Sequence, residues 1–582
     1  MQTRLLKLTM KEVNSMKKIL TLLFFTGTFV SYGQTGVDLT ASGDRYIEPA
    51  YRVALSPSIV DTTIETVIVE YPLLSLKYET KTEVDQINPA SIKTVEKLPQ
   101  LYNTYVKIGV GTELMPIGEV FFDATRSRKY IYGAHLKHLS SFGNVKDYAE
   151  STFDRTRVNL YAGINERRYT LRGDVHYNNQ GLHYYSASDT LGLDRDSIAQ
   201  RYSDFGFDAM YKSHKKDSAT LNYQIGLGYN NYISKKPLNK QDVDWRAREN
   251  YVGLTSTTWY KYKKETYAVD LNVRFNGYRY GLPDSTLTGL DSGIVLNNTI
   301  INLKPNITTT LQDKRFKAKV GLDLTFDIHN KTKVYIYPLA EVKYSMFNDI
   351  FIPYAGVRGG LEQTTFKSLT RENEFLLPNV YLQNEKKPIE FYGGIKGTLS
   401  KRISFNAGIS FANIRDKALF VTDTTFSIGN KFNVIYDTMN VTSIDASISY
   451  QLQEKLKIDV NGRFNSYSVL NNSYAWNLPR MEFLVRGSYN LFDKFLFNLD
   501  LSLEEGRKAL VYEMGDDVTV ENGQFVKSLG FITDLNLGIE YRYNKRISAF
   551  IECNNIVSQR YMRWYNTPVH AFQFLGGVTF RF

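Results

Sequence analysis

Apolar and polar side chains alternate along most of the chain from Tyr102 onwards. The clearest stretch runs from Phe316 to Ile328, where Phe, Ala, Val, Leu and Ile occupy every second position and Lys, Gly, Asp and Thr lie between them. A strand places successive side chains on opposite faces, so this pattern predicts a strand with one apolar and one polar face. The same alternation recurs at residues 157–164, 169–177, 495–504 and 535–542.

The last twelve residues, Ala571–Phe582, predict a strand of this kind with an aromatic face. The closing strand of a transmembrane β-barrel needs such a face, because one side meets lipid and the other meets the lumen. We expect Phe582 at the periplasmic rim, where the machinery that inserts barrels would meet it. We interpret the apolar side chains of that face as the insertion signal: Phe572, Phe574, Val578, Phe580 and Phe582.

Short and long connections alternate between the predicted strands, which gives an all-β, antiparallel transmembrane barrel of about 22 strands. Short turns are expected in the periplasm and long loops outside the cell, so both termini are predicted to be periplasmic. The count stays open by two or four, because Leu419–Val421 with Phe432–Tyr436, or Ala509–Tyr512, are alternative strands. The predicted long loops include residues 140–151, 178–201, 231–247, 280–296, 364–388, 412–440, 468–478, 505–529 and 558–567.

The first hundred residues differ from the rest. Residues 1–33 are predicted to be a signal peptide, because Lys17 and Lys18 precede an apolar run of about a dozen residues that is too short to span a bilayer. Met16 is an alternative start, which would make residues 1–15 an upstream extension. Residues 34–100 hold a third of the prolines and predict an extended periplasmic arm or a minimal plug.

Within the arm, one β-prone stretch has two interpretations. Glu65, Thr66, Val67, Ile68 and Val69 resemble the TonB box, the strand by which outer-membrane receptors pair with TonB. The same pattern also fits a plain piece of linker or a luminal strand.

The amino-acid composition excludes several kinds of function. Aromatic residues make up 14% of the chain, with 42 Tyr, which suits a membrane interface because the ring is apolar and the hydroxyl is polar. A single cysteine, Cys553, excludes a disulfide framework. The net charge of +11 is dispersed, which argues against nucleic acid as a partner. No histidine cluster or catalytic constellation stands out, so we expect no cofactor, no metal and no enzyme activity.

The predicted polar face mixes both signs of charge and would line the lumen. Such a surface can form either a hydrogen-bonded lining or a wet channel. Its members include Arg157, Arg172, Arg274, Lys317, Lys319, Lys457, Arg463, Arg542, Arg581, Asp174, Asp270, Asp323, Asp327, Asp459, Asp500 and Glu540.

Three pieces of the chain carry a resemblance to a family. Leu535–Phe582 resembles the C-terminal strands of TonB-dependent receptor barrels, and Leu101–Lys107 and Leu369–Phe375 resemble TonB-dependent-receptor-like outer-membrane proteins of Bacteroidota. The resemblance implies a 22-strand barrel over residues 101–582 that imports a scarce nutrient behind an N-terminal plug. Residues 34–100 are shorter than the plug of that family, so the sequence predicts a barrel without a full plug domain.

Two functions follow as hypotheses. The first is transport of a solute or nutrient across the outer membrane, through a lumen closed by the arm or by loops that fold inward. The alternative is a structural or accessory barrel in an envelope assembly complex. The expected partners are outer-membrane lipid, the barrel-insertion machinery and either TonB or another envelope protein.

Overall fold

The computed structural model describes the barrel and its loops. Described are residues 101–124, 127–215, 221–235, 246–281, 294–311, 315–329, 331–515 and 517–582. The predicted signal peptide 1–33, the arm 34–100 and the TonB-box candidate Glu65–Val69 lie outside these residues.

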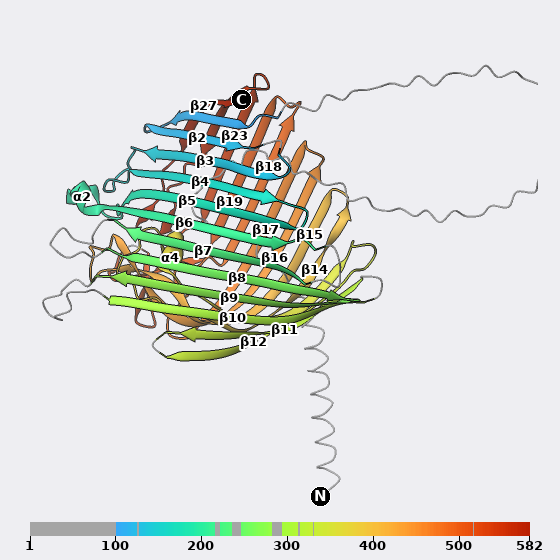
Figure 1. Cartoon of the computed structure of the whole chain (residues 1–582). Helices are drawn as coiled ribbons and strands as arrows, with labels where there is room; N and C mark the ends of the chain where they lie inside the picture. Colours follow the sequence, from blue (N-terminus) through green and yellow to red (C-terminus); the bar gives the residue numbers. More distant parts are fainter. Residues whose placement is uncertain are drawn as a thin grey trace, which may run out of the picture. The chain divides into compact units, whose positions relative to one another are not determined.

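Twenty-two antiparallel strands form one closed sheet, as the alternation predicted (Figure 1). The sheet closes because β1 (Thr104–Gly111) pairs with both β2 (Met115–Asp123) and β27 (Gln573–Arg581). Each other wall strand pairs with its neighbours in chain order, and β23 (Ile532–Arg542) follows β19 (Phe495–Glu505). The remaining wall strands are β3 (Tyr130–Ser141), β4 (Phe153–Asn165), β5 (Tyr169–His183), β6 (Ala199–Ser213), β7 (Asn222–Ser234), β8 (Arg248–Tyr262), β9 (Glu265–Tyr280), β10 (Ile294–Leu311), β11 (Phe316–Ile328), β12 (Thr332–Tyr344), β13 (Ile352–Glu362), β14 (Glu385–Ser400), β15 (Ile403–Asp423), β16 (Lys431–Leu452), β17 (Leu456–Val469), β18 (Met481–Leu491) and β24 (Ile547–Asn554).

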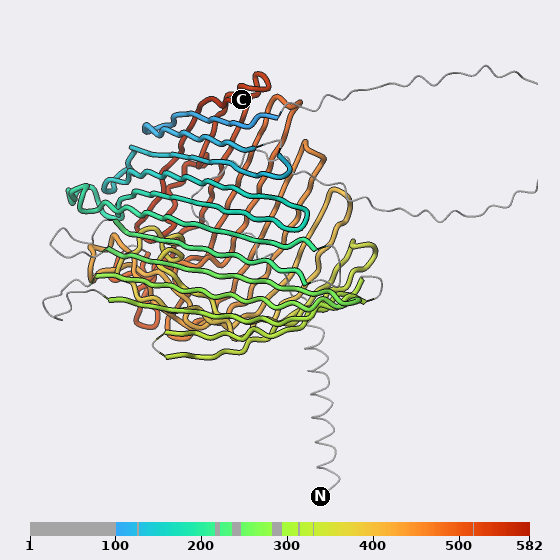
Figure 2. Tube along the Cα trace, in the orientation of Figure 1, coloured from blue at the N-terminus to red at the C-terminus, as the bar shows by residue number. Residues whose placement is uncertain are grey.

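The two ends of the barrel differ in their connections (Figure 2). Short turns gather at one end, which we call the turn end, and long connections gather at the other, the loop end. The long connections carry small elements of their own: η1 (Asp189–Leu191), α2 (Arg195–Ile198), α4 (Phe366–Glu372), β20 (Arg507–Val511), β21 (Val518–Glu521), β22 (Gln524–Leu529), β25 (Met562–Trp564) and β26 (Thr567–Pro568). Placement of the turn end in the periplasm stays a prediction.

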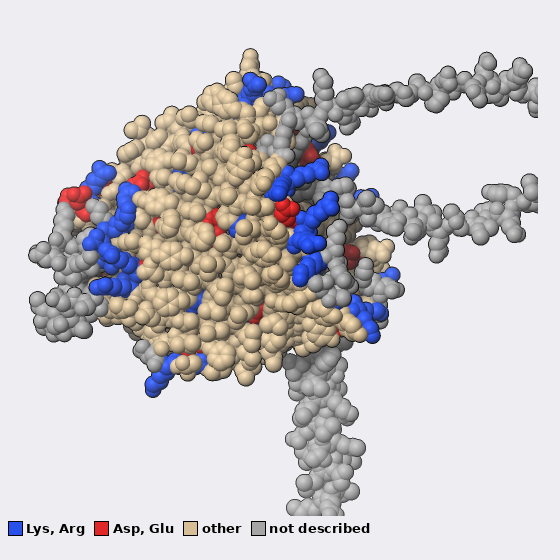
Figure 3. Space-filling model, in the orientation of Figure 1, with Lys and Arg blue, Asp and Glu red and all other residues tan. Residues whose placement is uncertain are grey.

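The wall separates apolar from polar side chains as the sequence pattern predicted. On β11, Val320 and Leu322 are exposed on the outer surface, whereas Asp323 and Thr325 are buried on the inner one. An outward apolar band with a polar interior is the arrangement that a barrel needs in lipid. Figure 3 shows a broad band of uncharged residues, with Lys and Arg at both rims, so basic residues are not confined to the turn end.

The predicted closing strand has the expected faces. Phe574 and Val578 are exposed on the outer surface, and Leu575 and Thr579 are buried on the inner one. The last residue helps close the barrel, since the Phe582 N–H donates to the Thr104 carbonyl at 2.9 Å. The role of this strand as an insertion signal stays a prediction.

Two of the predicted long loops contain the strands that the sequence left as alternatives. Residues 412–440 are mostly strand, because β15 and β16 continue past the band to residues 423 and 431. Within loop 505–529, β20, β21 and β22 form a separate three-stranded sheet. The alternative strands around Leu419, Phe432 and Ala509 therefore lengthen wall strands or build this small sheet, and the barrel keeps 22 strands.

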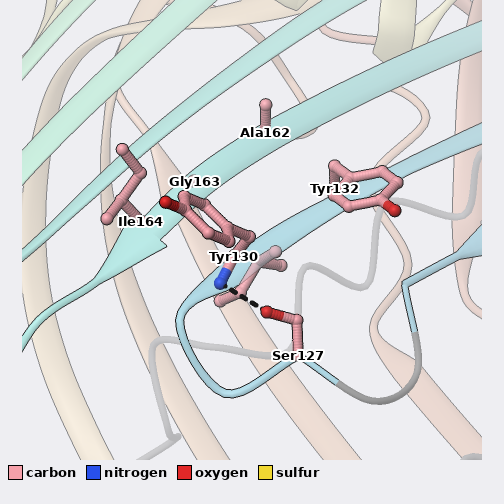
Figure 4. Close-up of a pocket in the computed structure, with 7 residues that line it drawn as sticks. Ser127, Tyr130, Tyr132, Ala162, Gly163 and Ile164 are labelled. Atoms are coloured by element: carbon pink, nitrogen blue, oxygen red, sulfur yellow. Dashed lines mark hydrogen bonds between the residues drawn. The ribbon is translucent and has the colours of Figure 1, made fainter.

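Near the turn end, a hollow of about 430 Å³ lies on the outer wall between β3 and β4 (Figure 4). Tyr130 and Tyr132 are half exposed beside it, and the Tyr130 N–H donates to Ser127 Oγ at 2.8 Å. Its lining is mainly apolar, and tyrosines at this level fit the aromatic girdle of a membrane barrel. The hollow therefore belongs to the lipid-facing surface. Among the described helices, none has the length and apolarity to cross a membrane.

Placing a charge on the outer surface should destabilise the barrel. Leu227 on β7 is exposed on the apolar face, and we expect Leu227→Arg to lower the free energy of unfolding by about 2–4 kcal/mol, the cost of arginine near the bilayer midplane. Urea titration in lipid vesicles measures the change. Gln224→Arg, on the luminal face of the same strand, is the matched control and should change stability by less than about 1 kcal/mol. Equal losses in both variants would contradict the assigned faces.

Candidate functional site

The connection between β13 and β14, residues 363–384, folds into the barrel, and we call it the inner loop. It contains α4, which lies behind β7 and β8 in Figure 1. A capping box starts the helix: Thr365 Oγ1 accepts from the Ser368 N–H, and Ser368 Oγ accepts from the Thr365 N–H, each at 3.0 Å. Because the helix is short, contacts with the barrel must hold it in place.

An aromatic cluster fixes α4 to the inner wall. Phe366 is fully buried, and its ring packs on Tyr278 of β9, Tyr232 of β7 and Tyr202 of β6, with centroid distances of 5.4, 5.7 and 6.3 Å. Rings arranged in this way add about 0.5–1.5 kcal/mol per pair beyond the area they bury. Leu369, one helical turn on, is buried in the same cluster.

The hydroxyl groups of the wall tyrosines bind the inner loop directly. Tyr278 donates to the Pro378 carbonyl at 2.6 Å, Tyr202 donates to the Glu374 carbonyl at 3.1 Å, and Tyr184 donates to the Leu376 carbonyl at 3.0 Å. The Tyr232 and Thr370 hydroxyls lie 2.8 Å apart. Each tyrosine thus buries its ring and satisfies a buried polar group of the loop.

Charged groups complete the attachment to this side of the wall. The buried Glu249 carboxylate on β8 accepts the N–H groups of Phe366 and Lys367 at the start of α4, where a negative charge is favoured. Lys367 Nζ lies 2.7 Å from Asp204 of β6, although burial lowers the pKa of this lysine. Beyond the helix, the Glu374 carboxylate accepts from Arg155 at 2.9 Å.

The far end of the inner loop binds the part of β16 that continues past the band. The Leu377 N–H donates to the Phe432 carbonyl at 2.9 Å, and the Phe432 N–H donates to the Phe375 carbonyl at 3.0 Å. On the same strand, β16, the Tyr436 hydroxyl donates to the Tyr381 carbonyl at 2.8 Å. The ends of the inner loop join β13 and β14, whereas its middle binds β6 to β9, so the inner loop crosses the lumen.

Other loop-end segments pack over this crossing. Trp564 of β25 stacks edge-on against Phe420 at 5.1 Å and packs on Phe432 at 5.8 Å. Its hairpin is tied to the β5–β6 loop, where Tyr185 donates to the Pro568 carbonyl at 2.8 Å. The inner loop and this hairpin share one hydrophobic cluster near the loop end.

The luminal lining pairs most of its charges internally. Lys417 on β15 lies 2.9 Å from Glu385, and Arg463 on β17 lies 2.6 Å from Asp445. The charged residues predicted to line the lumen are also paired with one another or with neighbours: Arg172–Asp174, Lys457–Asp459, Arg581–Glu540 and Lys304–Asp323 lie at 2.8, 3.0, 3.0 and 2.8 Å. The lining thus resembles a hydrogen-bonded surface of balanced charge. In the described part of the chain, no group of three or more His, Cys, Asp or Glu side chains is placed to hold a metal ion.

Glu372, at the end of α4, faces this lining. Its side chain is accessible to water inside the lumen, yet protein surrounds it closely enough that desolvation raises the pKa of its carboxyl group. The charged groups around it are Lys417 of β15, Glu385 of β14, Arg563 of β25 and Glu362 of β13. Desolvation is the largest cause of the raised pKa, while Lys417 and Arg563 lower the pKa and Glu385 and Glu362 raise it.

The inner loop was not identified from the sequence, which predicted residues 364–388 as an extracellular loop. A signal was present, because two short apolar runs lie there, at residues 375–377 and 380–382, and Thr365 with Ser368 form a capping pattern. The piece Leu369–Phe375, which carries part of the family resemblance, lies on this loop.

Comparisons with solved structures show what the barrel is similar to. No protein-family model matches the sequence, and no curated protein matches it. The siderophore receptor PirA from Acinetobacter baumannii superimposes with a TM-score of 0.62 at 10% identity, covering 84% of this chain and 81% of PirA. The FrpB iron transporter from Neisseria meningitidis gives 0.62 at 9% identity, with 83% and 82% covered. The copper transporter OprC gives 0.58 at 11% identity, with 84% and 82% covered. At such identities the matches show the fold alone: this chain shares the barrel fold of these receptors and transporters.

Proposed function

We propose that this protein is an outer-membrane transport barrel whose lumen is closed by its own inner loop. Solute would pass when this loop detaches from the wall. The observation that carries the proposal is the inner loop itself, which is bound to β6–β9 on one side and to β16 on the other. The superimposed structures are a copper transporter, a siderophore receptor and an iron transporter, which supports transport as the class of function.

The attachment of the loop suits a gate. Its bonds to the wall include hydrogen bonds from tyrosine hydroxyls, the backbone N–H groups that Glu249 accepts, and two ion pairs, at Lys367 and at Glu374. Each such bond contributes about 0.5–1.5 kcal/mol, so they hold the loop firmly as a set and can still be exchanged for water. The inner loop also carries an acidic group that water can reach, Glu372 at the end of α4, whose ionisation can change how firmly the loop is bound.

The raised pKa of Glu372 gives the proposal a pH test. The closed loop favours the protonated carboxyl group, so this contribution to closure is complete below the ordinary glutamate pKa and is lost as pH rises through the raised pKa. We expect ion flux through the purified full chain in proteoliposomes to increase as pH is raised from about 4 to 8. Glu372→Gln should keep the low-pH flux across the whole range.

A second variant keeps this experiment selective. Glu166→Gln removes an exposed carboxylate from the β4–β5 turn, where it pairs with Lys129, and should leave the pH response of the wild type intact. If neither wild type nor Glu372→Gln conducts at any pH, and a second polypeptide co-purifies with the barrel, the transport proposal fails. The alternative, an accessory barrel in an envelope complex, would then replace it.

A further inference from the structure

Four basic side chains form a row on the outer surface of β6 to β9, and we call them the basic row. Strand alternation places them outside, because they share a face with exposed apolar residues such as Val252 of β8 and Phe275 of β9. Figure 3 shows Lys and Arg gathered at the loop-end rim over these strands. The members of the row are Arg201 of β6, Lys235 just after β7, Arg248 of β8 and Arg279 of β9.

The pairing of the strands brings the basic row together. Arg248 and Arg279 are direct register partners in the β8–β9 ladder, so their Cβ atoms lie about 5 Å apart. The Lys235 N–H donates to the Arg201 carbonyl at 2.7 Å, which sets these two residues opposite each other in the β6–β7 pair. Four positive charges therefore lie across four neighbouring strands, over a width of about 15 Å.

Most of this charge is not neutralised by neighbouring side chains. Like charges directly opposite each other on one face of a ladder repel and destabilise the pairing. Arg201 is compensated, since its guanidinium group lies 2.5 Å from the Asp154 carboxylate of β4. Within the part of the chain that the structure describes, neither Lys235 nor Arg248 forms an ion pair. The basic row therefore carries an excess of positive charge that an anionic group from outside the chain can offset.

The basic row lies at the level of lipid headgroups. Tyr267, which is exposed near the turn end, lies on the same face of β9 as Arg279 and 12 residues before it. A tilted strand of about 9–11 residues crosses the hydrocarbon core of a bilayer. Arg279 therefore lies just beyond the core, among the headgroups of the leaflet at the loop end.

The charge at this level is a local feature of the rim. Beyond the exposed Phe411 of β15 and Ile444 of β16, the register partners Asn413 and Asn440 follow, and their side chains are joined by a hydrogen bond of 2.8 Å. The next partner of Asn440 along the sheet is Ser468 of β17. Neutral polar side chains are thus sufficient to end the apolar band, so the basic row needs a reason of its own.

We propose that the basic row binds the phosphate headgroup of a lipid in the leaflet at the loop end. Three of its four members are arginines, and a guanidinium group donates two parallel hydrogen bonds to a phosphate. A phosphate between Arg248 and Arg279 would accept from both side chains and offset their repulsion. The acyl chains of the same lipid would contact the apolar side chains below the row, including Val252 and Phe275.

The lipid site lies directly behind the wall residues that bind the inner loop. A phosphate there would hold β8 and β9 together from outside, on strands that the inner loop contacts from within. Binding of the lipid does not require the loop to move, so this site and the transport proposal can fail separately. Three members of the row are each next in sequence to a residue that binds the loop from the inner face: Arg201 to Tyr202, Arg248 to Glu249, and Arg279 to Tyr278.

Lipid titration of the purified full chain tests the site. The protein in neutral detergent is titrated with phosphatidic acid, and native mass spectrometry gives the dissociation constant of the bound lipid. We expect Arg248→Gln combined with Arg279→Gln to weaken binding at least tenfold. Lys263→Gln combined with Lys264→Gln is the matched control, because it removes two exposed positive charges from the turn at the other end of β8 and β9. The control should change the dissociation constant less than twofold.

Thermal unfolding, followed by the heat-modifiable mobility of the barrel, gives a second measurement. Without phosphatidic acid, the Arg248→Gln, Arg279→Gln protein should unfold at the wild-type temperature or above it, because it loses a like-charge pair. With phosphatidic acid, the midpoint of the wild type should rise and that of the double variant should not. Diacylglycerol with the same acyl chains, and inorganic phosphate at the same concentration, should each leave the wild-type midpoint unchanged.

Three outcomes would overturn the proposal. The first is a double variant that binds phosphatidic acid as tightly as the wild type. The second is equal stabilisation of the wild type by diacylglycerol or by inorganic phosphate, which would assign the effect to acyl chains or to the free ion. The third is a double variant that no longer forms a barrel, which would give the two arginines a structural role within the wall.

Discussion

Replacing the inner loop by a short turn is expected to convert the barrel into an open pore. Glu362 and Glu385 are direct register partners at the ends of β13 and β14, so a tight Asn-Gly turn can join these strands in place of residues 363–384. The replacement removes the segment that crosses the lumen and leaves the ladder intact. We expect single-channel conductance in planar bilayers to rise at least tenfold over that of the wild-type chain.

The chain offers a matched control for this deletion. Asp423 and Lys431 are register partners at the ends of β15 and β16, so residues 424–430 can be replaced by the same turn at the same end of the barrel. That variant also shortens a loop but leaves the crossing in place, and should stay closed. If the inner-loop variant forms a heat-modifiable barrel and still does not conduct, the inner loop is not the barrier.

The strands of the wall were predictable because the sequence of each strand reflects the two environments that its faces meet, lipid and lumen. Val320 and Asp323 on β11 face lipid and lumen, and the sequence shows this through strict alternation. Basic or polar residues mark the turns, so strand number and the alternation of short and long connections followed from local pattern alone. A closed 22-strand sheet then needs no long-range information beyond pairing of each strand with the next.

The loop-end structure was not predictable by the same rule. In β15, Leu419, Phe420 and Val421 are all buried, because the strand is covered on both faces once it rises above the band. Such a strand reads as a continuous apolar run, which alternation cannot assign. The loop interpretation of residues 412–440 failed for this reason.

The inner loop was missed because its partners are distant in sequence. Tyr202, Tyr232 and Tyr278 occupy ordinary luminal positions on three strands, and nothing local distinguishes them from other tyrosines of the lining. Their role in binding the inner loop becomes visible only in the structure, where Phe366, 88 residues after Tyr278 in the chain, packs among them. The short ladder between β12 and β13, which covers only residues 339–343 of β12, is similar, because Pro338 and the glycines opposite it mark its end only once the two strands are known to be neighbours.

Phe366→Ala is expected to detach the inner loop from the wall while the barrel stays folded. The ring is fully buried among three tyrosines, and a buried Phe→Ala change costs about 3–5 kcal/mol. All the lost contacts lie between loop and wall, so the loss falls on the closed arrangement and not on the strand ladder. At about 1.4 kcal/mol per tenfold, a loss of 3 kcal/mol raises the open-to-closed ratio roughly a hundredfold.

Single-channel recording measures that ratio directly, and Phe426→Ala provides the comparison. Phe426 lies in the β15–β16 loop with 40% of its surface exposed, so its removal should change the ratio less than twofold. Phe366→Leu, which keeps much of the buried volume, should fall between the two. A Phe366→Ala protein that loses its heat-modifiable barrel would show that the aromatic cluster holds the wall itself together. A protein that keeps the barrel and stays as closed as the wild type would show that Phe366 does not hold the gate.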